Sequence, residues 1–397
     1  MTDLSTPDRT LPAAARPPGA AGALRMAPLQ AAELAALQTP AYVFDASVVV
    51  ARYAALRAAL GTQLVVSLKA NSLVDLLLRC GAAFVDGVEL ASVGELEQAL
   101  PRVKSARYVN NPSMDEHFMR AALVSGCIFI VDSLQQAERL AQLPAARQQT
   151  RVLLRLNIGV ERGLADADQF GMGLADALRA GRLLQASGAV LLGVHAFAGS
   201  HRLASDGIAH VQALAALLPT LEAGLGQPLD TVNLGGGFAE DWEDHPAVLQ
   251  QYVAALAPLA ARRQLVHESG RGIFGRAGAF VTRVVATKRL GERRYAVCDG
   301  GIAQSFLLAG TENLLRRPRQ PHTVPERHDA DHAAEVRFVG SSCSRQDLIG
   351  RITATTLAPS VGDHVVFEEC GAYHSSYTVS SFLRLPAARQ YLRADVA

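Results

Sequence analysis

The sequence has few cysteines, no long hydrophobic run and almost no net charge, and each of these absences argues against a class of protein. Its five cysteines follow no CxxC spacing, which argues against a disulfide framework or a zinc site and favours free thiols in the cytoplasm. No run approaches the roughly 18 apolar residues that a membrane span requires. A formal net charge of +1 leaves no field of one sign to hold nucleic acid or a membrane surface.

Length and composition favour a two-domain α/β protein. Residues 1–27 are rich in Ala and Pro and lack the apolar segment of a signal peptide, so we expect a disordered tail there. The remainder exceeds the roughly 250 residues of a (β/α)8 barrel. We therefore predict a barrel over 48–282 and a β domain built from 28–47 and 283–397.

Short apolar runs alternate with helical stretches as far as residue 268, which predicts repeated βα units. Eight such runs favour a barrel over an open sheet. The predicted strands are Leu64–Lys69, Phe84–Glu89, Arg107–Asn110, Ile128–Val131, Val152–Asn157, Val190–His195, Thr231–Leu234 and Leu265–Glu268. The predicted helices include Val49–Leu60, Val74–Cys80, Met114–Val124 and Ala204–Ala223.

Beyond residue 280 the pattern changes to short strands separated by turns, which predicts the β domain. Residues 311–333 are polar and contain three prolines, so we expect a solvated loop there. The predicted strands are Phe280–Val285, Arg294–Cys298, Glu335–Phe338, His364–Phe367 and Tyr377–Phe382.

Reactive side chains gather at the carboxyl ends of the predicted barrel strands, the face where barrel enzymes place their sites. They are Lys69, Glu89, Asn110, Asp132, Arg155, His195, Gly235, Gly236, Gly237 and Glu268. Structural polar residues have no reason to choose one end of eight strands. We therefore expect an active site at this end.

Three of these groups suggest a phosphorylated aldehyde cofactor. The Gly235–Gly237 triplet and Arg271 would hold a phosphate, and Lys69 at the end of a dry strand would have a lowered pKa and form a Schiff base. The Glu268 carboxylate would keep a pyridine nitrogen protonated, as in pyridoxal 5'-phosphate (PLP) enzymes. Taken singly, each feature also has a structural explanation: a turn, a snorkelling lysine, a buried ion pair.

In combination and in order, the motifs resemble those of the fold-type III PLP-dependent decarboxylases, the family of ornithine, diaminopimelate and arginine decarboxylases. The resemblance covers about residues 40–386. It rests on Leu68-Lys69-Ala70-Asn71, Ala91-Ser92-Val93-Gly94-Glu95, Phe170-Gly171, Gly199-Ser200, Gly235-Gly236-Gly237-Phe238, Glu268-Ser269-Gly270-Arg271, Cys343 with Asp347, and Gly371-Ala372-Tyr373.

The resemblance implies a role for each matching residue. Lys69 carries PLP and Glu268 holds the pyridine nitrogen. The phosphate is bound by Ser200, Gly235, Gly236, Gly237, Gly270, Arg271 and Tyr373. Arg155 organises the pocket. Cys343 enters from the partner subunit of a homodimer and protonates the product carbanion.

Several positions depart from the family pattern. Phe197 stands where many members stack a histidine on the cofactor, and we place His195 on the alternate face of the strand. Glu89 replaces the usual aspartate, and Ser269 replaces a proline. Both of these changes look tolerable.

The sequence after Cys343 bears on the substrate. Members that act on ornithine or diaminopimelate have an acidic residue next, whereas this chain has Ser344 followed by Arg345. Loss of the carboxylate that pairs with a distal ammonium disfavours a free diamino acid. We therefore predict a conjugated, anionic or carrier-tethered amino acid, of the kind used in siderophore or other secondary-metabolite biosynthesis. Arg345 and Arg202 could meet its distal anionic group, and Asp299 and Asp347 are further candidates to orient it.

Other functions of the same barrel stay open. A diaminopimelate or ornithine decarboxylase is the nearest alternative. An amino-acid racemase of this type usually sets an arginine against the pyridine nitrogen, so Glu268 argues against it. A non-catalytic PLP carrier would not need the C-terminal domain with Cys343 and Tyr373.

Overall fold

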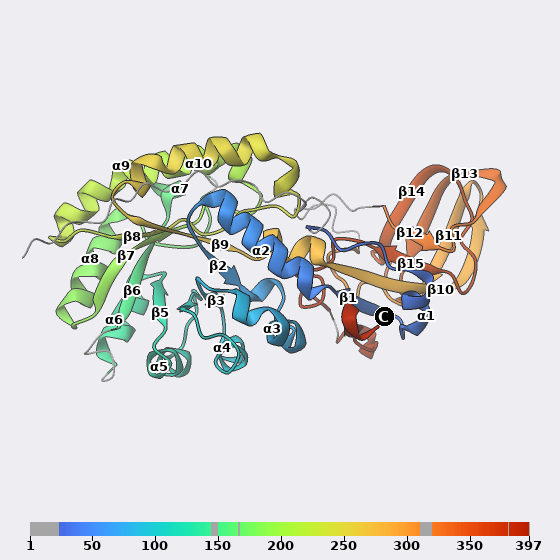
Figure 1. The fold of residues 1–397 in the computed structure, drawn as a ribbon, viewed down its shortest axis with the longest axis horizontal. Helices are drawn as coiled ribbons and strands as arrows, with labels where there is room; N and C mark the ends of the chain where they lie inside the picture. Colours follow the sequence, from blue (N-terminus) through green and yellow to red (C-terminus); the bar gives the residue numbers. More distant parts are fainter. Residues whose placement is uncertain (1–23, 144–149, 166, 310–319, 380, 397) are drawn as a thin grey trace, which may run out of the picture.

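The computed structural model describes residues 24–143, 150–165, 167–309, 320–379 and 381–396. A helix-covered barrel lies beside a β domain (Figure 1). Most of the predicted tail lies outside the described residues. The prediction is wrong for its end, because Met26 N–H donates to the carbonyl of Arg276 at 2.9 Å and the Met26 side chain is buried.

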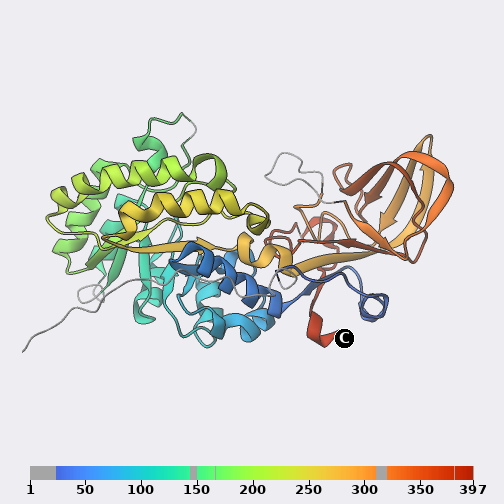
Figure 2. The ribbon, with the colours of Figure 1, turned by 45° about the horizontal axis from the view of Figure 1, so that its top comes forward.

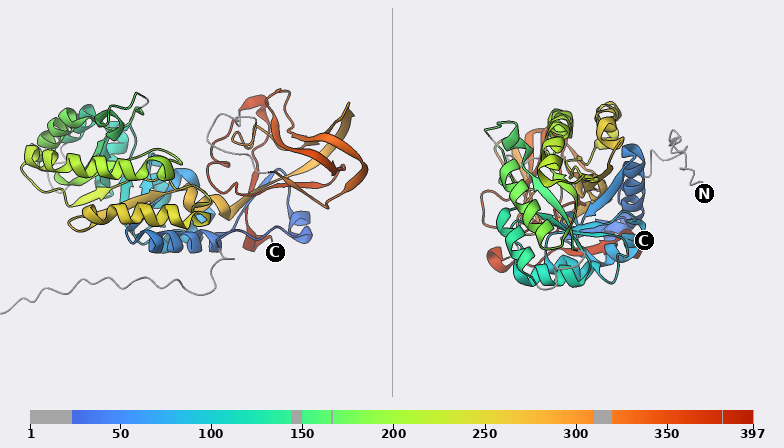
Figure 3. Two further views of the ribbon diagram at one scale, coloured as in Figure 1. Left: turned by 90° about the horizontal axis from the view of Figure 1, so that it is seen from above. Right: turned by 90° about the vertical axis from the view of Figure 1, so that its left-hand side faces the viewer.

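Eight parallel strands close into the predicted barrel. Helices cover the outer face of this barrel (Figure 3). Packed side chains fill its interior. Burial on both faces explains why the strands appear in the sequence as apolar runs. In chain order they are β2 (Gln63–Ser67), β3 (Val88–Leu90), β4 (Arg107–Val109), β5 (Ile128–Val131), β6 (Arg151–Leu156), β7 (Val190–Ala196), β8 (Thr231–Asn233) and β9 (Gln264–Ser269).

Four of the long barrel helices begin at a side-chain cap. The Asp45 carboxylate accepts from Ser47 N–H at 3.0 Å to start α2, and Gly61 ends α2 with a φ of 64°. The long helices are α2 (Ala46–Leu60), α3 (Val74–Cys80), α4 (Val93–Ala99), α5 (Glu116–Val124), α6 (Leu134–Gln142), α8 (Leu174–Ala186), α9 (Leu203–Leu225) and α10 (Pro246–Ala260). Short turns complete the unit: η2 (Leu68–Ala70), η3 (Gly81–Ala83), α7 (Ile158–Glu161), η5 (Trp242–Asp244), α11 (Arg271–Phe274) and η6 (Gly275–Ala277).

Helix α9 is long and apolar enough to cross a membrane by length and composition. It nevertheless lies alongside α10 on the outside of the barrel (Figure 2) and buries one face that includes Val211, Leu214 and Leu218. Its apolar character is therefore explained by packing in the barrel's outer layer.

The β domain joins both ends of the described chain. Strand β1 pairs with β10 and with β16, while a sheet of order β12-β15-β10-β11-β13-β14 forms the rest. The strands are β1 (Ala41–Phe44), β10 (Gly278–Leu290), β11 (Arg293–Cys298), β12 (His322–Val324), β13 (His328–Val339), β14 (Leu348–Leu357), β15 (His364–Phe367) and β16 (Arg389–Leu392). The remaining elements are α1 (Ala31–Ala36), η7 (Phe382–Arg384) and η8 (Arg393–Asp395).

Two predictions in this domain are wrong. Residues 311–333 are not one loop, because β12 and the start of β13 lie within the described part of that range. The described residues of 377–382 form a bend, irregular backbone and the start of η7 rather than a strand. Phe382 N–H donates to the carbonyl of Val379 at 2.9 Å, a bond between residues three apart that closes a turn and that an extended strand does not make.

Candidate active site

Lys69 lies between two carboxylates at the carboxyl end of the barrel. Its Nζ donates to both oxygens of Glu89, each at 2.9 Å, and Glu89 is fully buried at the end of β3. Desolvation is the largest single influence and lowers the pKa of Lys69, but the charges of Glu89 and Glu268 outweigh it and raise the pKa. The lowered pKa expected from burial alone is therefore wrong. With these two carboxylates beside it, Lys69 is held as a cation.

Glu268, at the end of β9, is ionised despite its burial. Burial raises its pKa, but the His195 imidazole, the Lys69 ammonium and a hydrogen bond from Asn233 outweigh this and lower the pKa to about 2. Asn233 Nδ2 donates to Glu268 Oε1 at 2.9 Å, and His195 Nε2 lies 3.5 Å from the same oxygen. A carboxylate fixed in this way can hold a protonated ring nitrogen.

His195 was expected on the opposite face from Phe197, and this expectation is wrong. Both residues line the same cavity as Lys69. Residues two apart on one strand share a face, and Phe197 follows β7 directly. The two-residue spacing in the sequence could have revealed this, whereas the contact with Glu268 depends on the barrel geometry.

A cradle of bare backbone lies beside these groups. A Cβ at Gly236 would lie 2.9 Å from the carbonyl oxygen of Glu268, and one at Gly237 would lie 2.8 Å from that of Gly199. Gly237 also has a φ of 109°, a conformation that side chains disfavour. At Gly270 a Cβ would lie 2.5 Å from the Cβ of Ala70. Only glycine fits at these positions, so the backbone itself forms the wall, as in anion-binding loops.

Arg271 and Tyr373 close the cradle from two different parts of the chain. The guanidinium carbon of Arg271 lies 4.9 Å from the centre of the Tyr373 ring. Tyr373 has a φ of 66°, and its N–H donates to the carbonyl of Ala70 at 2.6 Å. Asn71 Nδ2 donates to the carbonyl of Gly371 at 2.9 Å. These hydrogen bonds join the C-terminal part of the chain to the turn that carries Lys69.

Arg155 stands at the other wall of the cavity. It donates to Asp132 at 2.9 Å and to Asn110 at 3.3 Å, and its guanidinium carbon lies 4.6 Å from the centre of the Phe170 ring. Three predicted strand-end residues therefore meet in one buried cluster. This cluster fixes the side chain of Arg155 at the cavity edge.

The cavity has a volume of about 340 Å³ and brings together most of the predicted site. A lysine, an ionised carboxylate and an anion cradle face one space, and this combination fits a phosphorylated pyridine aldehyde. Its lining includes Lys69, Arg155, His195, Phe197, Ser200, Gly236, Gly237, Glu268, Gly270, Arg271 and Tyr373.

The predicted substrate residues lie elsewhere in this chain. Cys343 is exposed, and Cys343, Ser344, Arg345, Asp347 and Asp299 are not among the described residues that line the cavity. Their predicted roles stay predictions.

The two aspartates among them have backbone partners. The Asp347 carboxylate accepts from the N–H groups of Ile302 at 2.7 Å and Ser342 at 3.0 Å. The Asp299 carboxylate accepts from Arg283 N–H at 2.9 Å and from the Thr39 hydroxyl at 2.5 Å. Both carboxylates therefore brace local backbone in this chain.

Comparison with known proteins supports the same chemistry. A family model described as the pyridoxal binding domain of pyridoxal-dependent decarboxylases matches residues 46–275. The chain is 28% identical over 406 residues to the L-glutamyl-(BtrI acyl-carrier protein) decarboxylase of Niallia circulans, with 92% of each chain covered. It is 29% identical over 366 residues to the diaminopimelate decarboxylase of Deinococcus radiodurans, with 89% of this chain and 90% of the relative covered.

Among solved structures, the lysine decarboxylase of Selenomonas ruminantium matches with a TM-score of 0.77 at 23% identity, covering 90% of this chain and 93% of that one. At this identity the match supports the fold, a barrel joined to a β domain. The family model covers more than half of the chain, and its cofactor is the one that the cavity fits. The chain therefore belongs to the pyridoxal-dependent decarboxylase family and is an amino-acid decarboxylase that uses PLP.

Proposed function

We propose that the enzyme decarboxylates a conjugated, anionic or carrier-tethered amino acid, and that Lys69 carries its PLP. The observation that carries the substrate class lies beside Cys343. Ser344 offers no carboxylate, and the nearby Asp347 carboxylate already accepts two backbone N–H groups. A distal ammonium would therefore have no ready partner in this turn.

Different residues of the cavity would bind the phosphate, the ring nitrogen and the ring of the cofactor. The glycine loops and Arg271, with Ser200 and Tyr373, hold the phosphate. Glu268 would keep the pyridine nitrogen of the cofactor protonated, and Phe197 would offer the ring an apolar surface.

Bound PLP supplies an electron sink for the bond that breaks as CO2 leaves. Lys69 would hold the cofactor's aldehyde carbon through its ε-amine. Cys343 of a partner subunit delivers a proton to the substrate's α-carbon. This last role requires a homodimer with shared active sites.

Two further features belong to the proposal. Five cysteines without disulfide spacing are consistent with a cytoplasmic enzyme. The similarity to a carrier-protein decarboxylase supports the proposal that the enzyme acts in the biosynthesis of a siderophore or other secondary metabolite.

A substrate panel tests the proposal. CO2 release would be followed with PLP present, comparing free ornithine, lysine, diaminopimelate and arginine with citryl-diaminopropionate and a glutamyl-carrier protein. We expect turnover of a conjugate and little activity on the free diamino acids. Efficient turnover of a free diamino acid would instead favour the alternative that relatives such as diaminopimelate decarboxylase represent.

A matched pair of variants tests the structural reason. Ser344→Asp places a carboxylate directly after Cys343 and should raise activity on ornithine or lysine. Gln346→Asp adds the same charge two residues further along an exposed turn and should not. Equal gains from both variants would show that general charge, rather than this position, selects the substrate.

A further inference from the structure

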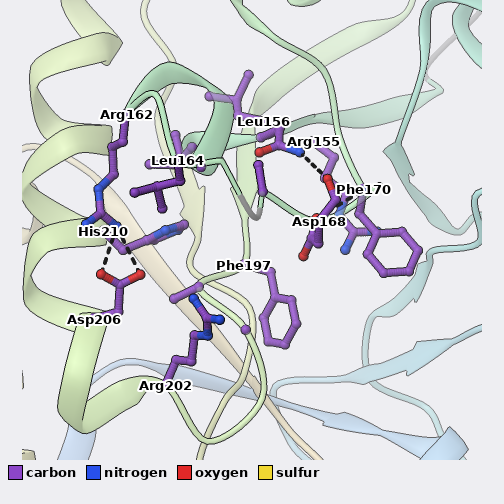
Figure 4. A pocket seen from close by; sticks show the side chains of 16 residues that line it. Arg155, Leu156, Arg162, Leu164, Asp168, Phe170, Phe197, Arg202, Asp206 and His210 are labelled. Carbon is purple, nitrogen blue, oxygen red and sulfur yellow. Dashed lines mark hydrogen bonds and ion pairs between the residues drawn. The ribbon is translucent and has the colours of Figure 1, made fainter.

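A second pocket opens beside the cofactor cavity, between the segment that follows β6 and the start of α9 (Figure 4). It has a volume of about 150 Å³. Arg155, Phe170 and Phe197 line both this pocket and the cofactor cavity. A substrate whose reacting end lies at Lys69 could therefore extend past Phe197 into this side pocket. Cofactor binding, as proposed above, does not require this side pocket.

His210 projects from α9 into the side pocket (Figure 4). His210 is 4% exposed, and within the part of the chain that the structure describes its buried Nε2 has no hydrogen-bond partner. Burial lowers the pKa of His210 to about 4 and outweighs the opposing charge of Asp206. The imidazole is therefore neutral, and its Nε2 can donate or accept one hydrogen bond with an uncharged group. Buried polar atoms in folded proteins normally have such a partner.

The charges around the pocket are largely compensated. Arg162 donates to both oxygens of Asp206, at 2.9 and 3.0 Å, and so neutralises it. Arg155 is paired with Asp132 outside the pocket. Arg202 and Asp168, of opposite charge, are both exposed residues of the lining.

The interior therefore offers a neutral hydrogen-bonding group rather than a carboxylate for an ammonium. Ile158, Leu164 and Phe197 supply apolar wall around it. A cavity of roughly 150 Å³ is large enough for a benzene-sized group. Size and polarity together suit a short, uncharged, polar chain.

We propose that the side pocket binds the amide-linked distal end of a conjugated amino acid, with His210 as the buried hydrogen-bond partner of the amide. This inference rests on the proposed function, because only a conjugated substrate has such an end. It makes His210 a specificity residue rather than a catalytic one, since it lies beyond Phe197 from the reacting atoms.

Steady-state kinetics on paired substrates would test the proposal. One pair is free L-glutamate and its γ-propylamide, N5-propyl-L-glutamine; the other is 2,3-diaminopropionate and its N3-acetyl derivative, whose distal end is also an uncharged amide. His210→Leu should raise KM for the amide member about tenfold, as expected for the loss of a buried hydrogen bond, and leave its kcat within twofold. His210→Gln should restore most of the loss. The free amino acids should be unaffected.

Two controls separate a binding role from a structural one. His117→Leu changes an exposed histidine of α5 and should alter neither KM. Leu164→Trp fills the side pocket from another wall and should raise KM for the amide member alone, even if His210→Leu proves unstable. The absorbance spectrum of bound PLP should be unchanged in every variant.

The outcomes distinguish the two proposals. Turnover of conjugates with selective KM effects supports the side pocket. Turnover of conjugates with no selective effect from His210→Leu or Leu164→Trp overturns the side pocket and leaves the proposed function intact. Turnover of free diamino acids alone overturns both.

Discussion

Removal of the Glu89 charge should make Lys69 easier to deprotonate. Both Glu89 oxygens accept from Lys69 Nζ at 2.9 Å, and the charge of Glu89 is the leading influence that raises the lysine pKa against desolvation. A charge pair at about 4 Å contributes about 1 kcal/mol in water and about 4 kcal/mol near a protein surface. The Lys69 side chain is 44% exposed to the open cavity, so solvent screening places the effect in the lower half of that range. We expect Glu89→Gln to lower the pKa of Lys69 by about one to two units.

The assay is the pH dependence of PLP attachment to cofactor-free protein, followed by absorbance across neutral and alkaline pH. Only the neutral amine reacts with the aldehyde, so a lower pKa moves the profile to lower pH. Glu95→Gln is the matched control, because Glu95 is half-buried nearby but accepts from Ala91 N–H rather than from Lys69. A Glu89→Gln profile that does not move, or moves no further than that of Glu95→Gln, would refute the reasoning.

Other perturbations have equally direct expectations. Arg271→Ala should weaken PLP binding about 10- to 100-fold by removing a charged phosphate partner, as equilibrium dialysis would show; unchanged affinity would contradict its role. Arg52→Met should lower the free energy of unfolding by about 2–3 kcal/mol in urea titrations, because the fully buried guanidinium donates to the carbonyls of Gly272 and Glu240 while Glu243 keeps its pair with Arg276. Because the pKa of Glu268 is lowered from 4.5 to about 2, its charge stabilises the fold above pH 4.5, and this contribution is lost as the pH falls toward 2. In Glu268→Gln the free energy of unfolding should therefore depend less on pH between 4.5 and 2 than it does in the unmodified protein. An unchanged pH dependence would contradict the assigned ionisation.

The barrel could be predicted from the sequence because its strands are buried on both faces. Each predicted barrel strand has a counterpart, and Ile128–Val131 matches β5 at both ends. The strands of the β domain were harder to predict from the sequence. The first five residues of β13 are exposed and four of them are polar, so they lack the alternation that indicates a strand. Their partner β14 was missed as well: its apolar residues Leu348, Ile349, Ile352 and Leu357 do not alternate with polar ones along its sequence.

The site could be predicted in composition but not in its contacts. The strand-end positions of Lys69, Glu89 and Glu268 were evident from the sequence. The charge state of Lys69 was not, since it depends on which carboxylates the closed barrel brings within reach. His195 was set aside although it shares a face with Phe197, and its contact with Glu268 arises because β7, β8 and β9 are neighbours. The side pocket around His210 left no pattern in the sequence.

The central claim is that Lys69 carries the cofactor, and borohydride reduction followed by peptide mapping tests it most directly. The chain has three lysines, Lys69, Lys104 and Lys288, and the latter two are exposed on the surface. The account predicts that reduction fixes one pyridoxyl phosphate group per chain on the peptide that contains Lys69, and that Lys69→Ala abolishes the labelling. Labelling of Lys104 or Lys288 in its place, or retention of the label in Lys69→Ala, would contradict it.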